Sequence, residues 1–205
     1  MKERPILFSG EMVQAILDGR KTQTRRVIKP QPKLYSAMHR FNTFIQWKDI
    51  DAKEIFAVIF IASHCPYGQP GGDRLWVRET WAELCAPDEL SGEVDLAYKA
   101  TGWPDGEFGP DRNGKGWRPA IFMPRWASRI TLEMTGVRVE RLQDISYEDA
   151  EAEGAPIEGG SIVQNRRIGF EHLWDSINAK RGYGWDANPW VWVIKFRRVE
   201  SGTAR

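Results

Sequence analysis

Residues that could perform chemistry gather in the sequence GRKTQTRR at positions 19–26. Lys21 and Thr24 could act together as a base and a nucleophile, because a lysine with a lowered pKa can take the proton of a hydroxyl group. The three arginines of the segment could hold a phosphate or a planar base, since a guanidinium is flat and stays charged. Eight Lys or Arg residues and no acidic residue lie between positions 19 and 48, which favours a binding role for this stretch.

The neighbouring sequence indicates how this segment is positioned. Residues 5–8 form a short apolar run that predicts a strand, and Ser9 is a suitable N-cap for the helix that follows. Gly19 suits the position after the helix, and residues 21–28 predict a strand that two prolines end. The helix presents one apolar face, made of Met12, Val13, Ile16 and Leu17. The candidate site is therefore expected where a helix passes into a strand.

The rest of the chain is predicted to contain mostly strands. An apolar run predicts a buried strand over 54–63, and clear alternation predicts another over 73–81. A long strand is expected over 130–142, with Gly136 as a bulge or bend, and a closing strand over 190–197.

Two further helices are expected in the C-terminal half. Ser146 and Asp149 have the spacing of a capping box, and Gly154 closes this short helix. A second, amphipathic helix is indicated by Phe170, Leu173, Trp174 and Ile177. The segment 140–158 carries seven acidic residues and one arginine, so Glu153 within it is also a suitable ion-pair partner for the basic segment.

The composition is that of an ordinary globular protein. Its 205 residues are 41% hydrophobic, and a net charge of +1 gives no overall argument for nucleic-acid binding. Strands and helices do not alternate regularly, which favours an α+β fold whose small antiparallel sheet closes into a barrel with flanking helices. We expect a single domain over 1–205, with long insertions at about 31–70 and 82–125.

The sequence gives no indication of a metal centre. Cys65 and Cys85 have no metal-ligand spacing, and the three histidines, at 39, 64 and 172, are scattered. We therefore expect no metal and no cofactor. No signal peptide and no apolar run long enough to span a membrane is seen, which predicts a cytoplasmic protein without a membrane partner.

Four segments, in this order, resemble the ASCH domains of the PUA-like β-barrel superfamily. The first is the helix with GRKTQTRR at 19–26, close to the family's G-x-K-x-x-x-x-R signature, and the second is GDRLWVR at 72–78, which is similar to its G-D-x-L-x-V strand. The third is the long strand with the capped helix that ends at Glu153-Gly154, and the fourth is the closing strand. Together they cover about half of the chain and neither insertion.

This resemblance implies a barrel with a cleft that takes a nucleobase, a nucleoside or RNA. Small members of the family are amidohydrolases that remove acyl groups from N4-acylated cytidine without a metal, and a lysine, a threonine and a glutamate are implicated. Lys21, Thr24 and Glu153 stand at the matching positions and are the predicted catalytic residues. Two assignments remain open: Lys21 as the base with Glu153 donating a proton to the leaving amine, or Glu153 as the base with Lys21 stabilising the oxyanion.

Four residues are predicted to bind the substrate, which are Arg20, Arg26, Trp76 and Arg78. Trp76 and Arg78 share one face of their strand, and Glu79 lies on the other. Other ASCH-type proteins are linked to RNA binding or RNA cleavage, so a non-catalytic RNA or modified-base binding module is the alternative function, and a ribonuclease is a weaker one. The expected partner is a nucleoside or nucleobase, or RNA, and the sequence leaves the oligomeric state open.

Overall fold

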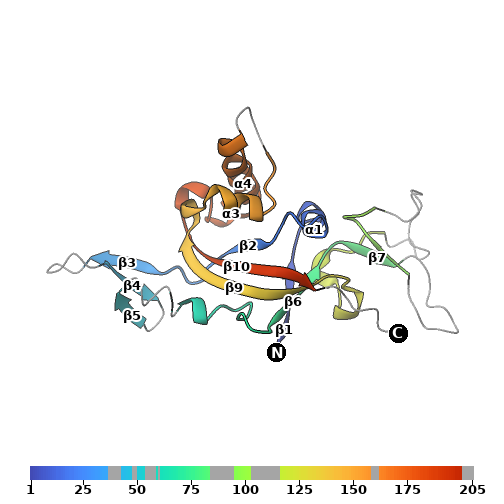
Figure 1. The fold of residues 1–205 in the computed structure, drawn as a ribbon, viewed down its shortest axis with the longest axis horizontal. Helices are drawn as coiled ribbons and strands as arrows, with labels where there is room; N and C mark the ends of the chain where they lie inside the picture. Colours follow the sequence, from blue (N-terminus) through green and yellow to red (C-terminus); the bar gives the residue numbers. More distant parts are fainter. Residues whose placement is uncertain are drawn as a thin grey trace.

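The computed structural model of the chain describes residues 1–36, 43–47, 50–53, 59, 61–83, 95–102, 116–157 and 162–199. Figure 1 shows a central, curved sheet, with the three labelled helices above its strands in this view. Smaller β units lie toward the two ends of the long axis of the molecule.

The central sheet has five strands in the order β1-β6-β9-β10-β2. Their bounds are Glu3–Leu7 for β1, Gln23–Val27 for β2, Arg74–Arg78 for β6, Thr131–Arg141 for β9 and Trp190–Val199 for β10. These strands confirm the ones expected at 5–8, 21–28, 73–81, 130–142 and 190–197. The predicted strand at 73–81 is shorter than expected, because it ends at Arg78.

The pairing of the edge strands differs from the antiparallel barrel that was expected. β1 runs parallel to β6, while the remaining pairs in the sheet are antiparallel. A parallel pair needs a long connection, and here more than sixty residues separate Leu7 from Arg74. Among the described strands the sheet is not closed, since β1 and β2 form its two edges. The mixed α and β content is confirmed, whereas a closed barrel is not found in the described part of the chain.

The two longest strands, β9 and β10, curve together across the molecule (Figure 1). Their register shifts, because Lys195 pairs with Gly136 whereas Phe196 pairs with Met134. The extra residue on β9 is Thr135, next to Gly136, so the predicted bulge is confirmed.

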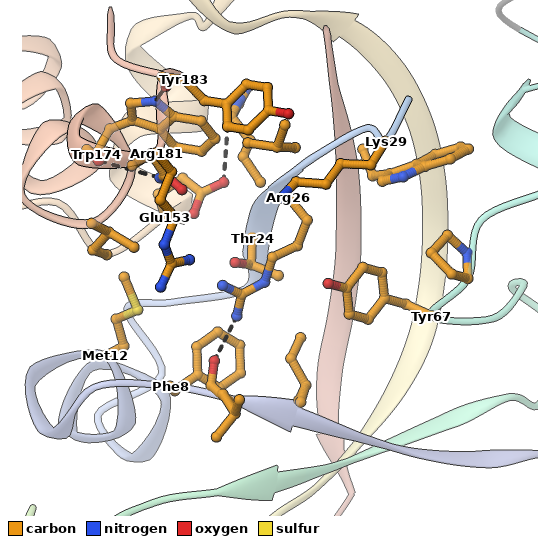
Figure 2. Close-up of a pocket in the computed structure, with 18 of the residues that line it drawn as sticks. Phe8, Met12, Thr24, Arg26, Lys29, Tyr67, Glu153, Trp174, Arg181 and Tyr183 are labelled. Atoms are coloured by element: carbon orange, nitrogen blue, oxygen red, sulfur yellow. Dashed lines mark hydrogen bonds and ion pairs between the residues drawn. The ribbon is translucent and has the colours of Figure 1, made fainter. Parts of the chain in front are cut away.

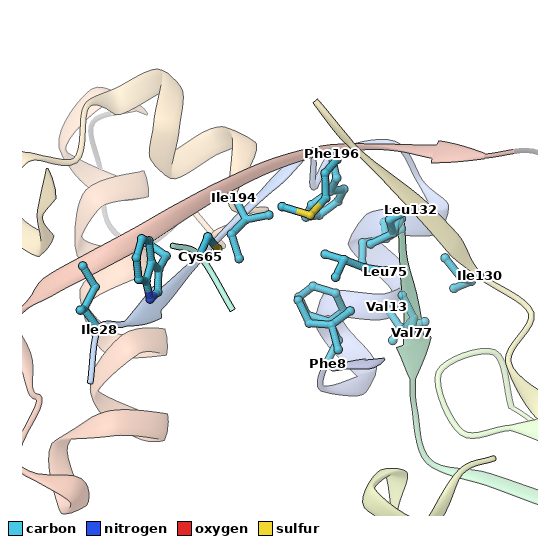
Figure 3. Packing of buried hydrophobic residues seen from close by; sticks show 14 of the residues in the cluster. Phe8, Val13, Ile28, Cys65, Leu75, Val77, Ile130, Leu132, Ile194 and Phe196 are labelled. Atoms are coloured by element: carbon cyan, nitrogen blue, oxygen red, sulfur yellow. The ribbon is translucent and has the colours of Figure 1, made fainter. Parts of the chain in front are cut away.

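The main hydrophobic core lies between this sheet and the first helix, α1 (Gly10–Leu17). Figure 3 shows Phe8 and Val13 packing toward Leu75 and Val77, with Leu132 nearby. All five side chains are buried, and each contributes about 1.5–3 kcal/mol to folding. This packing fixes α1, and therefore the start of the segment 19–26, against the sheet.

The ends of α1 are formed by the residues expected from the sequence. The Ser9 side chain accepts a hydrogen bond of 3.4 Å from the Met12 amide at the N-terminus. Gly19 follows the C-cap Asp18 with a φ of +74°, a left-handed conformation that glycine adopts without strain. The helix thus ends at Leu17, four residues before Lys21, at the point where the chain turns toward β2.

The two C-terminal helices are also confirmed. α3 (Tyr147–Ala152) begins at Ser146, whose side chain accepts from the Asp149 amide at 3.1 Å. α4 (Ile162–Asn178) packs Phe170 and Trp174 into a second apolar cluster on the other face of β10, together with Val191. α3 and α4 contact each other, so α4 supports the helix that ends at Glu153.

The predicted insertions contain small β units of their own. β3 (Lys33–Ser36), β4 (Thr43–Trp47) and β5 (Ile50–Lys53) form a three-stranded antiparallel sheet, and β7 (Trp81–Glu83) pairs with β8 (Leu96–Tyr98). The strand expected over 54–63 is wrong at its described end, because residues 61–63 are helical. A short apolar run fits a buried helix as well as a buried strand. The rest of that run lies outside the described residues, apart from the exposed and helical Ile59.

Short 3-10 turns complete the described elements, which are η2 (Ala120–Phe122), η3 (Arg125–Ala127), η4 (Leu142–Asp144), η5 (Ala179–Arg181) and η6 (Trp185–Ala187). Within the described residues, no helix has the length and apolar character needed to cross a membrane.

Candidate functional site

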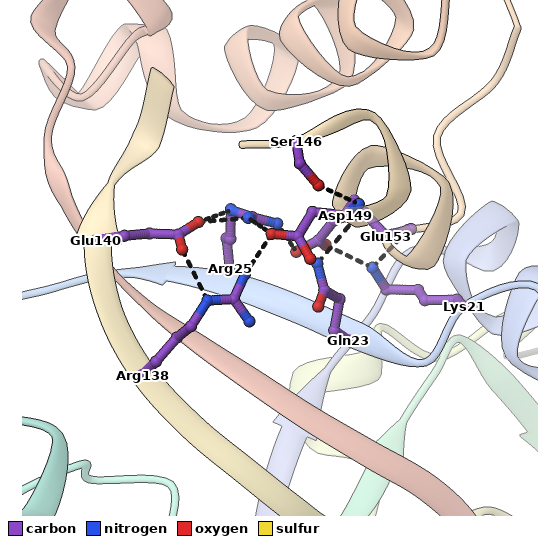
Figure 4. Close-up of polar contacts among 8 residues, drawn as sticks. All are labelled: Lys21, Gln23, Arg25, Arg138, Glu140, Ser146, Asp149 and Glu153. Atoms are coloured by element: carbon purple, nitrogen blue, oxygen red, sulfur yellow. Dashed lines mark hydrogen bonds and ion pairs between the residues drawn. The ribbon is translucent and has the colours of Figure 1, made fainter. Parts of the chain in front are cut away.

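Lys21 and Glu153 are far apart in the sequence and are in direct contact in the structure (Figure 4). The Lys21 Nζ donates to the Glu153 Oε2 at 2.9 Å and to the Glu153 carbonyl oxygen at 2.7 Å. Glu153 is the C-cap residue of α3, and its backbone forms an isolated bridge with Lys21. The exposed fraction of the side chain is 0% for Lys21 and 4% for Glu153. Two of the three predicted catalytic residues therefore form a buried ion pair.

Arg25 holds the other oxygen of the Glu153 carboxylate. Its Nη1 donates to the Glu153 Oε1 at 3.1 Å, and its side chain is fully buried. The ring centroid of Phe170 lies 5.7 Å from the guanidinium carbon. Because Lys21 binds one oxygen and Arg25 the other, the carboxylate is fixed in one orientation.

Two further carboxylates balance the charge of Arg25. Its Nε lies 3.2 Å from the Glu140 Oε1, and its Nη2 lies 2.8 Å from the Asp149 Oδ2. Arg138 joins the same two carboxylates, with its Nε 2.8 Å from the Glu140 Oε2 and a second contact to Asp149 (Figure 4). A buried charge is tolerated when it is paired in this way, and removal of one partner is strongly destabilising.

Alternation along the chain explains which residues reach this cluster. Lys21, Gln23 and Arg25 all contact α3 or its C-cap, and the Gln23 Nε2 donates to the Asp149 carbonyl oxygen at 3.0 Å. Thr24 and Arg26 lie on the opposite face of β2, because successive side chains of a strand point to opposite faces. The polar residues at 21, 23 and 25, opposite an acidic segment, were the sequence signal for this network.

Gly154 allows the chain segments around Lys21 to approach closely. It has a φ of +73°, and a Cβ at this position would lie 2.9 Å from the Ala15 Cβ and 3.2 Å from the Lys21 Cβ. The Lys21 amide also donates to the Ala15 carbonyl oxygen at 2.9 Å. The glycine therefore lets α1, Lys21 and the end of α3 pack against one another.

The surroundings of Lys21 lower its pKa. Burial is the largest cause, since it disfavours the charged ammonium, and the positive charges of Arg26 and Arg25 act in the same direction. The charge and hydrogen bond of Glu153 oppose these effects without cancelling them. Arg25 and Arg26 thus help to lower the pKa of Lys21, which is what a role as a catalytic base would require.

A cavity of about 780 Å³ opens beside the ion pair. It is lined by Leu7 and Phe8 at the end of β1, by Val27 of β2, and by Trp174 and Ile177 of α4. The cavity therefore lies between the two edge strands of the sheet, where the sheet does not close. Its volume falls in the range of sites that take small organic ligands.

Thr24 and Glu153 line this cavity, whereas Lys21 is not among the described residues that line it. Figure 2 shows Thr24 beside Arg26, with Glu153 at the same cavity. The residue that can touch a ligand is therefore Glu153, and Lys21 lies behind it. This arrangement favours Glu153 as the acid or base, with Lys21 acting through the carboxylate that it holds.

Arg26, one of the four predicted binding residues, lines the cavity next to Thr24. Its Nη2 donates to the Leu7 carbonyl oxygen at 2.6 Å, and its guanidinium carbon lies 5.2 Å from the centroid of the Phe8 ring. Its Nε is buried and has no hydrogen-bond partner. That N–H group is therefore an unsatisfied buried donor beside the cavity.

Of the other three predicted binding residues, Arg78 lines the cavity, whereas Trp76 and Arg20 do not. Arg78 lines the cavity, and its guanidinium stacks over the ring of Trp76 with a distance of 4.7 Å to the centroid. Trp76 is buried and is not among the lining residues that the structure describes. Arg20 is also outside the lining, because it lies on the surface and pairs with Asp18 at 2.8 Å. The structure brings Arg26 and Arg78 to the cavity and leaves Arg20 and Trp76 outside it.

Sequence reasoning missed the wall of the cavity that faces α4. The Lys29 Nζ lies 5.0 Å from the centroid of the Tyr183 ring, and the Trp174 Nε1 donates to the Tyr183 carbonyl oxygen at 2.7 Å. Arg181, the last residue of η5, lines the same wall. Lys29 belongs to the basic segment and could have been found there. Arg181 and Tyr183 lie in a turn that matches no motif.

Metal ligands do not gather in the described part of the chain, where no group of three His, Cys, Asp or Glu residues could hold an ion. Cys65 is buried, and burial raises the pKa of its thiol. The position of Cys85 lies outside the described residues.

Comparison with known proteins gives one similarity in fold. No family model matches the sequence, and no curated protein matches it. The structure is similar to the crystal structure of an ASCH domain from Lactobacillus crispatus, with 10% sequence identity and a TM-score of 0.42. The match covers 96% of this chain and 79% of that chain.

Proposed function

We propose that this protein hydrolyses N4-acylated cytosine nucleosides and releases the acyl group as a carboxylic acid. The observation that carries the proposal is that Thr24 and Glu153 line one cavity while Lys21 and Arg25 fix the Glu153 carboxylate. A hydroxyl and a fixed carboxylate are the groups that amide hydrolysis requires. The nature of the substrate follows from the motifs that resemble the ASCH amidohydrolases.

In the proposed reaction Glu153 carries a proton between the reacting groups. As the Thr24 Oγ1 bonds to the carbonyl carbon, Glu153 takes the hydroxyl proton. Glu153 then gives this proton to the exocyclic nitrogen as the C–N bond breaks and cytidine leaves. A water molecule, deprotonated in the same way, releases the acyl group from Thr24, so that the sum is one amide and one water giving one amine and one acid.

Arg26 is suited to stabilise the oxyanion that forms on the carbonyl. It stands two residues from Thr24 on the same face of β2, and both residues line the cavity. A donor that is already in place for a developing charge contributes strongly to catalysis. Lys21 and Arg25 are positioning residues in this scheme, because they act through the carboxylate of Glu153.

The test is the conversion of N4-acetylcytidine to cytidine, followed by absorbance. We expect Glu153→Gln to lower kcat/KM by about 100- to 10,000-fold, and Thr24→Val to abolish turnover while the protein stays folded. Glu151→Gln is the matched control, because Glu151 belongs to the same helix but pairs with Arg166 at the surface. Failure of the folded wild-type protein to convert N4-acetylcytidine, or full activity of Glu153→Gln, would contradict the proposal.

A second candidate function, binding of RNA or a modified base without chemistry, is favoured by the aromatic lining of the cavity. Tyr67, Trp174 and Tyr183 line it together with cationic side chains, and stacking on an aromatic ring contributes about 1–3 kcal/mol per base. Binding of a cytidine-containing RNA without any turnover would support this function. Strong weakening of that binding by salt would show that phosphate contacts contribute.

A further inference from the structure

The charged residues that line the cavity are mostly positive. Among the described lining residues Glu153 is the one carboxylate, and the basic residues are Arg25, Arg26, Lys29, Arg78 and Arg181. Two of the three hydrogen bonds that reach Glu153 come from Lys21, and the third comes from Arg25. The single carboxylate is therefore already neutralised. Arg25 is also balanced by Glu140 and Asp149, and the unbalanced excess of positive charge in the described lining is that of Arg26, Lys29, Arg78 and Arg181.

Lys29 and Arg181 carry part of this excess. Neither forms an ion pair with a carboxylate of the described residues. In Figure 2 they lie on opposite sides of the cavity, with Tyr183 between them. The Lys29 ammonium is held over the Tyr183 ring at 5.0 Å, and Arg181 is two residues before Tyr183 in the turn that follows α4. Two cationic side chains, those of Lys29 and Arg181, therefore lie near Tyr183 at the cavity.

We propose that Lys29 and Arg181 bind the phosphate group of a nucleotide whose base enters the cavity. The identity of the base rests on the proposed function, whereas the phosphate subsite rests on the charges alone. A guanidinium can donate two parallel hydrogen bonds to phosphate oxygens, and an ammonium adds a point charge. The natural substrate is then an acylated nucleotide, either free or at the end of an RNA chain, rather than a nucleoside without phosphate.

The first experiment compares the binding of cytidine 5′-monophosphate and cytidine to the wild-type protein by calorimetry at two salt concentrations. We expect the nucleotide to bind about 10- to 100-fold more tightly at low salt, as charge-assisted hydrogen bonds imply, and the difference to shrink as salt is added. Lys29→Gln and Arg181→Gln should each reduce this preference and leave the affinity for cytidine unchanged. Lys180→Gln is the matched control, because Lys180 is the exposed neighbour of Arg181 and does not line the cavity.

Turnover separates the failure of the subsite from the failure of the proposed reaction. A preference for the nucleotide that is lost in Lys29→Gln and Arg181→Gln, without hydrolysis of any N4-acetyl compound, would keep the subsite and overturn the reaction. Hydrolysis of N4-acetylcytidine with equal affinity for nucleotide and nucleoside, or a preference that survives in both variants, would overturn the subsite. Tighter binding of a cytidine tetranucleotide than of the mononucleotide, lost in the same variants, would keep the subsite and assign the phosphate to an RNA chain.

Discussion

The Arg26 Nη2 donates a hydrogen bond of 2.6 Å to the Leu7 carbonyl oxygen, and this bond joins the two edge strands of the central sheet. Leu7 is the last residue of β1, and Arg26 lies within β2. A side chain thus spans the place where backbone pairing would have closed a barrel. The cavity lies at this same place, and Leu7, Thr24 and Arg26 all line it.

The ion pair between Lys21 and Glu153 should contribute to stability as a coupled unit. Lys21→Met removes the ammonium and leaves Glu153 buried with Arg25 alone, so we expect a loss of about 3 kcal/mol in the free energy of unfolding. The double variant Lys21→Met/Glu153→Gln should recover on the order of 2 kcal/mol of the summed losses. Urea unfolding of the wild type and the three variants measures this coupling. Strictly additive losses would show that the two side chains do not stabilise each other.

The pH dependence of the reaction should distinguish the two roles considered for Lys21. Its pKa lies below the 10.5 of a free lysine, mainly because of burial. If Lys21 must stay charged to hold Glu153, kcat/KM falls as the pH rises through this lowered pKa, and we expect this result. A rise in kcat/KM over the same interval would instead identify Lys21 as the base.

The titration of Lys21 does not itself lower the stability of the fold at alkaline pH. Between the lowered pKa and 10.5 the unfolded state binds more protons at Lys21 than the folded state does. The contribution of Lys21 to the free energy of unfolding therefore increases with pH across that interval. Urea unfolding at each pH is the control for the kinetic measurement.

Asp149 should make the protein sensitive to acid. Burial raises the pKa of its carboxyl group, but the hydrogen bond from Arg25 and the charges of Arg25 and Arg138 outweigh burial and lower the pKa below 3.8. The stabilisation is present in full above the unfolded value and is lost as the pH falls through the folded value. Asp149→Asn should therefore flatten the decrease in stability below about pH 4. Asp144→Asn, at an exposed aspartate outside the ion-pair cluster, is the control.

Much of the fold could be predicted because its signals are local. Ser9 and Ser146 cap the helices that they were expected to cap, and Gly136 lies at the predicted bulge. The parallel pairing of β1 and the open edge beside β2 depend on contacts between distant parts of the chain, to which no local pattern is sensitive. The strand expected over 54–63 failed at its described end because apolar content alone does not separate a helix from a strand.

Part of the site could also be predicted, because the motifs that indicate it are local. The motifs paired Lys21 with Glu153, and the structure places the two side chains in contact. Asp149 was recognised as a capping residue, but its carboxylate binds Arg25 and Arg138, which no capping pattern indicates. Arg181 reaches the cavity because of the way in which α4 packs, so its position could not follow from the sequence around it.

Gly154→Ala should damage both the stability and the site. The left-handed conformation alone costs about 1–2 kcal/mol for a residue with a Cβ, and the new methyl group would meet Ala15 and Lys21 at 2.9 Å and 3.2 Å. Gly182→Ala is the matched control for stability, since Gly182 has a φ of +79° and no described heavy atom within 4 Å of the added Cβ.

We expect urea unfolding to show a clearly larger loss of stability for Gly154→Ala than for Gly182→Ala, because only the former adds a steric clash to the backbone strain. Displacement of Lys21 should also weaken its hold on Glu153, so kcat should fall in Gly154→Ala more than KM changes. Equal losses of stability in the two variants would mean that the segments around Gly154 can separate without cost. In that case the close packing of α1 against the end of α3 would not be what holds Lys21 on the Glu153 carboxylate.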